Sequence, residues 1–83
     1  MIDADPRWAT ALSAAVLAVL VDQRWHTSAE IVDDTQLLPL AVRVALRDLA
    51  VDGLVRRGVE GRWQITAGGM LEAARRDAER RVR

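Results

Sequence analysis

Arginine is the residue whose chemistry and spacing stand out in this chain. All twelve basic residues are arginine, and none is lysine. Arg43 and Arg47 lie four residues apart in a helical pattern, so they share one helix face. A guanidinium is a planar fork of donors that can grip a phosphate or the acceptor edge of guanine. The pair suits recognition of an anion or a base, and the alternative is two solvated arginines on a surface helix.

Three more arginines stand at the corners of an expected hairpin. Arg56, Arg57 and Arg62 flank a turn around Val59-Glu60 that two glycines bound. At such a tip they can reach phosphates or a narrow minor groove. Glu60 repels phosphate, and one of Arg56 and Arg57 must point toward the body because side chains alternate along a strand. At most about two of the three are therefore expected as contacts.

The C-terminal part of the chain is a tract in which arginines alternate with acids. Pairs such as Glu72 with Arg76 and Asp77 with Arg81 are spaced to stabilise an exposed helix. Non-specific electrostatic attraction to DNA is the alternative role. The arginines of this segment are Arg75, Arg76, Arg80, Arg81 and Arg83.

Catalytic chemistry finds little support. His26 is the only histidine and the chain has no cysteine, so a metal site is not indicated. Ser28 beside His26 lacks a third, orienting group. Gly68-Gly69 lacks the lysine of a phosphate-binding loop. The protein is expected not to be an enzyme and to hold no cofactor or metal.

The charge distribution is uneven although the net charge is zero. Residues 1–42 carry six acids and two arginines, whereas residues 43–83 carry six acids and ten arginines. A neutral total argues against a generic polyanion binder, but a basic second half can present a local positive face. Simple drift of surface charges is the alternative. A hydrophobic fraction of 51% indicates a real core and argues against disorder.

The patterns predict one domain over residues 1–83, α+β but mainly α. A first helix over residues 6–22 begins at Asp5-Pro6, an N-cap followed by proline. A stub strand at 25–27 leads to Thr27, which caps a second helix over residues 28–34. Glu30 completes its capping box. Residues 35–38 form a turn from which Leu37 enters the core.

A third helix over residues 39–51 and a hairpin follow. Pro39 begins this helix, and Gly53 ends it in a left-handed conformation. Strands at 54–57 and 62–66 form the hairpin, and Thr66 caps a fourth helix over residues 67–80. The buried stripe of the third helix is expected to be Val42, Ala45, Leu46 and Leu49.

The first helix is apolar nearly all round. The stripe expected to face the core is Trp8, Leu12, Ala15, Val16 and Val19. Leu17, Leu20 and Val21 make the opposite side apolar too. In so small a domain that second side suggests a homodimer interface, formed with the fourth helix. The alternative is that an alanine-rich surface is merely tolerated.

The segment PLAVRVALRDLAVDGLVRRG, at 39–58, resembles the third helix and first wing strand of bacterial winged helix-turn-helix regulators, including MarR-like and PadR-like proteins. WQITAGG is similar to their second wing strand running into a capped helix. The resemblance covers about residues 25–70. It implies a three-helix core, a two-stranded wing at 54–66 and a C-terminal helix. It also implies a DNA-binding transcriptional regulator, or a phage-type accessory factor, with double-stranded DNA as partner.

The resemblance further implies which residues touch DNA. The third helix would enter the major groove and the wing would meet the flanking minor groove or phosphates. The start of the second helix would offer hydroxyls and N–H groups to a phosphate. The candidate DNA-binding residues are Thr27, Ser28, Leu40, Ala41, Arg43, Val44, Arg47, Arg56, Arg57 and Arg62.

Three of these positions depart from the family pattern. Leu40, Ala41 and Val44 stand where DNA readers typically carry polar residues. Apolar side chains can touch thymine methyls, but they cannot read donors and acceptors. The alternative function is therefore a protein-interaction adaptor that docks a partner on the apolar face of the third helix.

No secretory signal and no bilayer-spanning run is apparent. The N-terminus starts with Asp3 and Asp5 rather than with basic residues. The apolar run at 9–21 is too short to cross a bilayer and is interrupted by Thr10 and Ser13. A cytoplasmic location, away from membranes, is expected.

Overall fold

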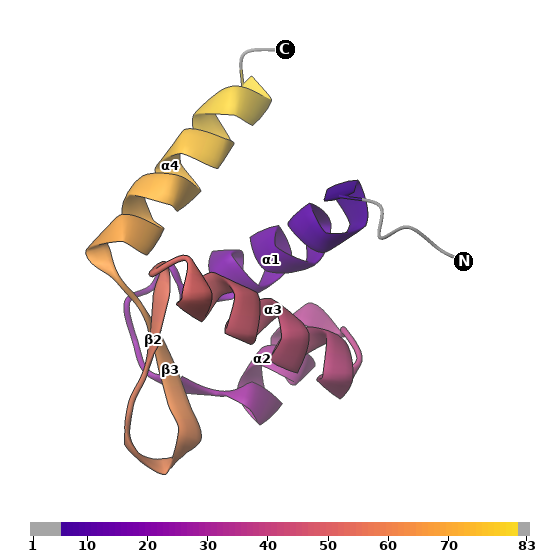
Figure 1. Cartoon of the computed structure of the whole chain (residues 1–83), viewed down its shortest axis with the longest axis vertical. Helices are drawn as coiled ribbons and strands as arrows, with labels where there is room; N and C mark the ends of the chain where they lie inside the picture. The colour runs from indigo at the N-terminus through magenta and orange to yellow at the C-terminus, as the bar shows by residue number, and fades with distance from the viewer. Residues whose placement is uncertain (1–5, 82–83) are drawn as a thin grey trace.

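The computed structural model describes residues 6–81, and side chains from residue 11 onward. The expected cap at Asp5, the side chain of Trp8 and the charge of Arg83 lie outside this described part. Four helices and three short strands follow one another along the chain (Figure 1). Their order is α1 (Pro6–Leu20), β1 (His26–Thr27), α2 (Ser28–Thr35), α3 (Pro39–Val51), β2 (Val55–Arg57), the single 3-10 turn η1 (Val59–Gly61), β3 (Arg62–Ile65) and α4 (Ala67–Arg81).

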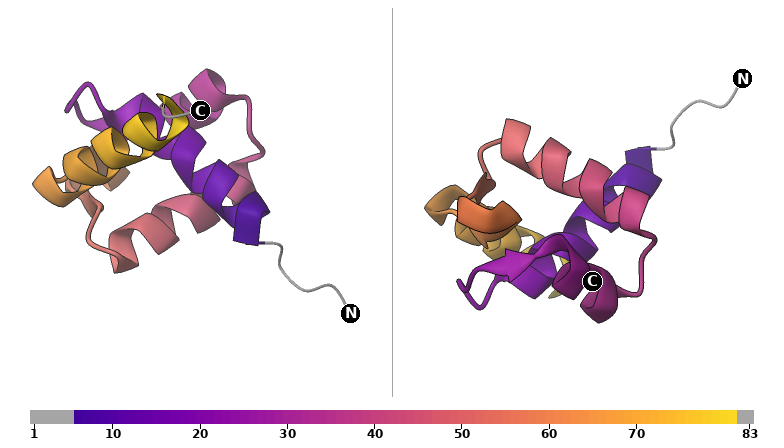
Figure 2. Two further views of the ribbon diagram at one scale, coloured as in Figure 1. Left: turned by 90° about the horizontal axis from the view of Figure 1, so that it is seen from above. Right: turned by 90° about the horizontal axis from the view of Figure 1, so that it is seen from below.

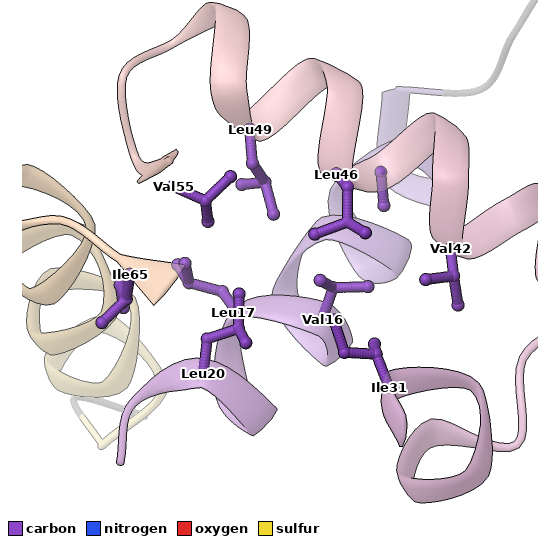
Figure 3. Close-up of a cluster of buried hydrophobic side chains, with 10 residues drawn as sticks. Val16, Leu17, Leu20, Ile31, Val42, Leu46, Leu49, Val55 and Ile65 are labelled. Atoms are coloured by element: carbon purple, nitrogen blue, oxygen red, sulfur yellow. The ribbon is translucent and has the colours of Figure 1, made fainter. Parts of the chain in front are cut away.

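The core forms where α1, α2 and α3 meet the sheet (Figure 3). Val16 of α1 lies toward Ile31 and Leu46, whereas Leu17 and Leu20 lie toward Ile65 of β3. The expected division of α1 into a core side and an interface side was therefore wrong for Leu17 and Leu20, which are completely buried within the domain. The helix is apolar nearly all round because helices cover one side and the sheet and α4 cover the other.

The end of α1 comes two residues before the expected one. Gln23 adopts a left-handed conformation with a φ of 67°. Its N–H donates to the Leu20 carbonyl over 3.0 Å, which closes the last turn. Val21 and Asp22 consequently belong to the turn rather than to the helix.

Helix α2 has the expected capping box. The Thr27 hydroxyl accepts from the Glu30 N–H over 3.1 Å, and the Glu30 carboxylate accepts from the Thr27 N–H over 2.8 Å. The helix runs one residue beyond the expected end, to Thr35, whose hydroxyl donates to the Ile31 carbonyl. Gln36 then takes the left-handed conformation that ends it.

Helix α3 buries the expected stripe. Val42, Ala45, Leu46 and Leu49 are all buried, and Leu37 packs against the same core. Gly53, with a φ of 76°, turns the chain from the helix into β2. In Figure 2, α3 lies along one side of the domain and α4 toward the other, with α1 crossing between them.

The sheet has three strands, because the expected stub strand pairs with the two-stranded wing. The strand order is β1-β3-β2, and both pairings are antiparallel. In the register, His26 faces Trp63 across β1 and β3, and Arg57 faces Trp63 across β2 and β3. The stub therefore anchors the inner edge of the hairpin, while the hairpin itself projects from the body (Figure 1).

The junction between β3 and α4 is tightly packed. The Thr66 hydroxyl accepts from the Gly69 N–H over 3.0 Å and donates to the Gly53 carbonyl over 2.7 Å. A Cβ atom at Gly69 would overlap the Leu54 carbonyl and the Ile65 side chain. Glycine is required there because the α4 backbone lies directly against the start of the wing.

Candidate nucleic-acid interface

The outer surface of α3 is a single stripe of alternating apolar and basic side chains. Leu40, Arg43, Val44 and Arg47 recur at three- and four-residue spacing and are all exposed; we call them the α3 face. The exposed fraction is 68% for Leu40 and 42% for Val44. Ala41 is half-buried beside the stripe. Because the buried residues of α3 point to the opposite side, this face is free of the core.

The two guanidinium groups of the α3 face have no ion pair with any carboxylate of the described residues. The local sequence explains this. The positions three and four residues away from Arg43 and Arg47 hold Pro, Leu, Val, Ala or the other arginine, and never an acid. Like charges four residues apart on a helix repel one another weakly. An anion bound between the two groups would relieve that repulsion.

The arginines of α4 are arranged in the opposite way. Arg75 and Arg76 both contact Glu72, and Arg75 also contacts Glu79. Arg80 and Arg81 share Asp77, at 3.2 and 3.1 Å. The pairs Glu72–Arg76 and Asp77–Arg81 thus form as their spacing predicts. Hydrogen bonds from Arg75 and Arg76 lower the pKa of Glu72 to about 2.

The wing arginines lie against aromatic rings. The guanidinium carbon of Arg56 is 5.2 Å from the centre of the Trp25 ring, and that of Arg57 is 5.9 Å from the Trp63 ring. Both side chains stay exposed. Arg57 shares the side of the strand that faces the body with Val55, as strand alternation predicts.

The wing tip combines an ion pair with an exposed apolar residue. Glu60 takes a left-handed φ of 59° and lies 3.7 Å from Arg62. Arg62 is therefore partly neutralised by the acid that was expected to repel phosphate. Val59 at the same tip is 81% exposed.

The start of α2 is already occupied by a carboxylate. Glu30 accepts hydrogen bonds from the Thr27 backbone and hydroxyl, and these bonds lower the pKa of Glu30. Thr27 is thus a cap first. Ser28 makes no side-chain hydrogen bond among the described residues, so its hydroxyl is the more available of the two.

Three residues of this surface were not among the candidates from sequence. Trp25 and Gln64 contact Arg56, and Val59 extends the wing tip. Trp25 could have been found from its position directly before an edge strand, because an exposed aromatic ring in a loop needs a packing partner. The contact with Arg56 depends on the pairing of β1 with β3, which no local pattern specifies.

A separate groove of about 690 Å³ lies between α1 and α4. In Figure 2, the α3 and α4 helices lie on different sides of α1. Small apolar side chains and the charged edge of α4 line the groove. Its apolar lining includes Ala14, Ala18, Val21 and Ala73. This groove is the surface that α1 and α4 share. Of the α1 residues expected on the interface side, Leu17 and Val21 line the groove and Leu20 does not.

Among the described residues, no group of three or more histidine, cysteine or acidic side chains is placed to hold a metal ion. No helix in that part of the chain is both long enough and apolar enough to cross a membrane.

Comparison with solved structures relates this architecture to known proteins. A mutant of ZitR from Lactococcus lactis in the apo form has a TM-score of 0.73 and 23% identity, over 90% of this chain and 61% of the other. A MarR family protein of Mycobacterium tuberculosis has a TM-score of 0.71 and 29% identity, over 86% of this chain and 57% of the other. A second ZitR mutant has a TM-score of 0.71 and 24% identity, over 94% and 56%.

The chain is a winged helix-turn-helix protein, as its sequence patterns predict. The helices α2 and α3 form the helix-turn-helix, and β2 and β3 form the wing. The chain spans 56% to 61% of the length of the three solved chains described above. No protein-family model and no curated protein matches it.

Proposed function

We propose that this protein is a small DNA-binding regulator that places the α3 face in the major groove of double-stranded DNA. The observation that carries the proposal is the pair of unpaired guanidinium groups, Arg43 and Arg47, on the exposed side of a winged-helix α3. The fold shared with a MarR family protein supports it. The activity we propose is DNA recognition and binding rather than catalysis. We place this activity in the cytoplasm.

The residues divide into two roles. Arg43 and Arg47 bind guanine edges or phosphates, and Leu40, Ala41 and Val44 contact thymine methyl groups. The wing arginines Arg56, Arg57 and Arg62, with Thr27 and Ser28 of the α2 start, contact backbone phosphates and set the orientation. Because few bases can be read by two arginines and three apolar residues, much of the affinity would come from phosphate contacts.

The test is an anisotropy titration of labelled duplex DNA at low salt with wild type and two double variants. Arg43→Ala with Arg47→Ala removes two charges from the α3 face, and Arg80→Ala with Arg81→Ala removes two from α4. We expect a loss on the order of 10-fold or more per arginine on α3 and little change on α4. No wild-type binding at about 100 µM protein, or equal losses in the two variants, would contradict the proposal.

The adaptor alternative makes a different prediction, which is tested by capture of a protein partner beside the DNA titration. It rests on the exposure of Leu40 and Val44, and the fold comparisons favour the DNA reading. A Leu40→Ser and Val44→Asp variant that loses a captured protein partner, while wild type never binds DNA, would support the adaptor.

We also propose that two copies associate through the groove between α1 and α4. Its small apolar side chains permit close approach, and its position leaves the α3 face free for DNA. Ala18→Glu in the groove should shift the sedimentation coefficient from dimer to monomer. Ala50→Glu, at an exposed position near the end of α3, is the matched control that should leave the mass unchanged.

A further inference from the structure

The outer side of the wing carries a stacked arrangement that the candidate site does not explain. Trp25 lies in the loop before β1, is 40% exposed and takes no part in the hydrophobic core. Its ring packs against Arg56 of β2, whose guanidinium carbon is 5.2 Å from the ring centre. A cation over an indole face is an attractive contact, and it restrains a side chain that is otherwise mobile.

Gln64 of β3 orients the same guanidinium. Its Nε2 donates to the Gln23 carbonyl over 2.8 Å, so its Oε1 must face the other way, toward Arg56. That oxygen accepts from the Arg56 Nε over 2.9 Å and also from Nη2. The amide therefore connects Arg56 to the left-handed residue that ends α1.

The backbone of the wing makes room for the ring. A Cβ atom at Gly58 would overlap the Trp25 ring. The φ of Gly58 is −108°, which any residue adopts, so glycine is needed there for space and not for backbone freedom. A tryptophan and an amide from two segments thus contact one arginine, and Gly58 leaves the space that the tryptophan ring fills.

We propose that Trp25 is a positioning residue that, with Gln64, holds Arg56 ready for a DNA backbone phosphate beside the groove that α3 enters. A guanidinium has five N–H donors. Gln64 accepts from Nε and Nη2, which leaves the Nη1 and Nη2 edge for the two oxygens of one phosphate. The inference rests on the proposed DNA-binding function, and its first test does not require DNA.

The first test examines free protein by NMR. In wild type, the Nε–H resonance of Arg56 should be shifted upfield by the Trp25 ring and protected from exchange by Gln64. Trp25→Ala should abolish the shift, whereas Trp25→Phe, which keeps an aromatic face, should retain much of it. Thermal unfolding by circular dichroism serves as the folding control. An Arg56 resonance that is the same in wild type and Trp25→Ala would overturn the inference.

The second test measures the salt dependence of DNA binding. Each lost phosphate contact lowers the slope of log affinity against log salt by about 0.9. Trp25→Ala and Arg56→Ala should each reduce the slope by about this amount, and the double variant should reduce it no further. Trp25→Phe should restore the wild-type slope. Gly58→Ala, which displaces the ring without removing it, should resemble Trp25→Ala.

The outcomes separate the two proposals. Binding by wild type with an unchanged slope in Trp25→Ala, or additive losses in the double variant, overturns the positioning role alone. Absence of wild-type binding overturns the DNA-binding function and with it this use of the stack, even where the NMR shift is present.

Discussion

Both α3 and α4 expose arginine side chains, yet only those on α3 are available to a ligand. On α4, acids stand three and four residues from the arginines, and every arginine from 75 to 81 shares a carboxylate. On α3, no acid occupies those positions around Arg43 and Arg47. The number of positive charges therefore says little about anion binding. The spacing of the acids determines which charges are satisfied within the helix.

The largest effect is expected when α3 is given acids at the same spacing from its arginines as on α4. Leu40→Glu with Val44→Glu places a carboxylate three residues before each arginine of the α3 face. We expect DNA affinity to fall by about 100-fold or more, since two arginine contacts are lost and two acids face the phosphates. Leu40→Gln with Val44→Gln, matched in size but neutral, should keep most of the affinity. Equal losses in both variants would assign the face to apolar contacts instead.

A single-residue version applies to the wing. Gln64→Glu would keep an acceptor for Arg56 and turn the pair into an ion pair, as on α4, although it would lose the hydrogen bond to the Gln23 carbonyl. We expect a loss of affinity on the order of 10-fold and a shallower salt slope by about 0.9. The measurement is the same anisotropy titration over a range of salt. An affinity at or above that of wild type would contradict the role of Arg56.

The reverse change releases arginines on α4. Glu72→Gln with Asp77→Asn removes the carboxylates that Arg76, Arg80 and Arg81 contact, and it leaves Arg75 with Glu79 alone. Non-specific DNA affinity should rise a few-fold and become more sensitive to salt, by about 0.9 in slope for each phosphate gained. The same titration with random duplex measures this rise. No change would mean that α4 lies too far from bound DNA to take part.

The smallest effect concerns pH. The hydrogen bonds from Arg75 and Arg76 lower the pKa of Glu72 from 4.5 to about 2 in the folded protein. A depressed pKa stabilises the fold fully above the unfolded value, and that stabilisation is lost as pH falls from about 4.5 toward 2. The melting temperature of wild type should therefore fall slightly across this window. Glu72→Gln should show a smaller fall, and identical pH profiles would remove Glu72 from the account.

Local patterns predicted the parts of the fold that depend on near neighbours. The buried stripe of α3 follows from helical spacing, and the caps at Thr27 and Thr66 follow from residue type and the acid or glycine three residues later. The exposed positions of the α3 face then follow by exclusion. For these elements, the residues within a single helix were enough to predict which side chains are buried and which are exposed.

The features that were missed depend on contacts between distant segments. Leu17 and Leu20 looked like a second face because periodicity cannot tell a helix buried on two sides from one that meets another subunit. The third strand requires β1 to find β3, far along the chain, and two residues carry no strand pattern of their own. The stack of Trp25 on Arg56 depends on that pairing, so it too was outside the reach of sequence patterns.

The hydroxyl of Thr66 has a mechanical consequence. It bonds both to Gly53, where α3 ends, and to Gly69, where α4 begins. Helix α4 is about 22 Å long, and these two hydrogen bonds fix its first turn to the end of α3, the helix that we place on DNA. A partner that tilts the C-terminal end of α4 would therefore move the Thr66 junction, and with it both α3 and the wing.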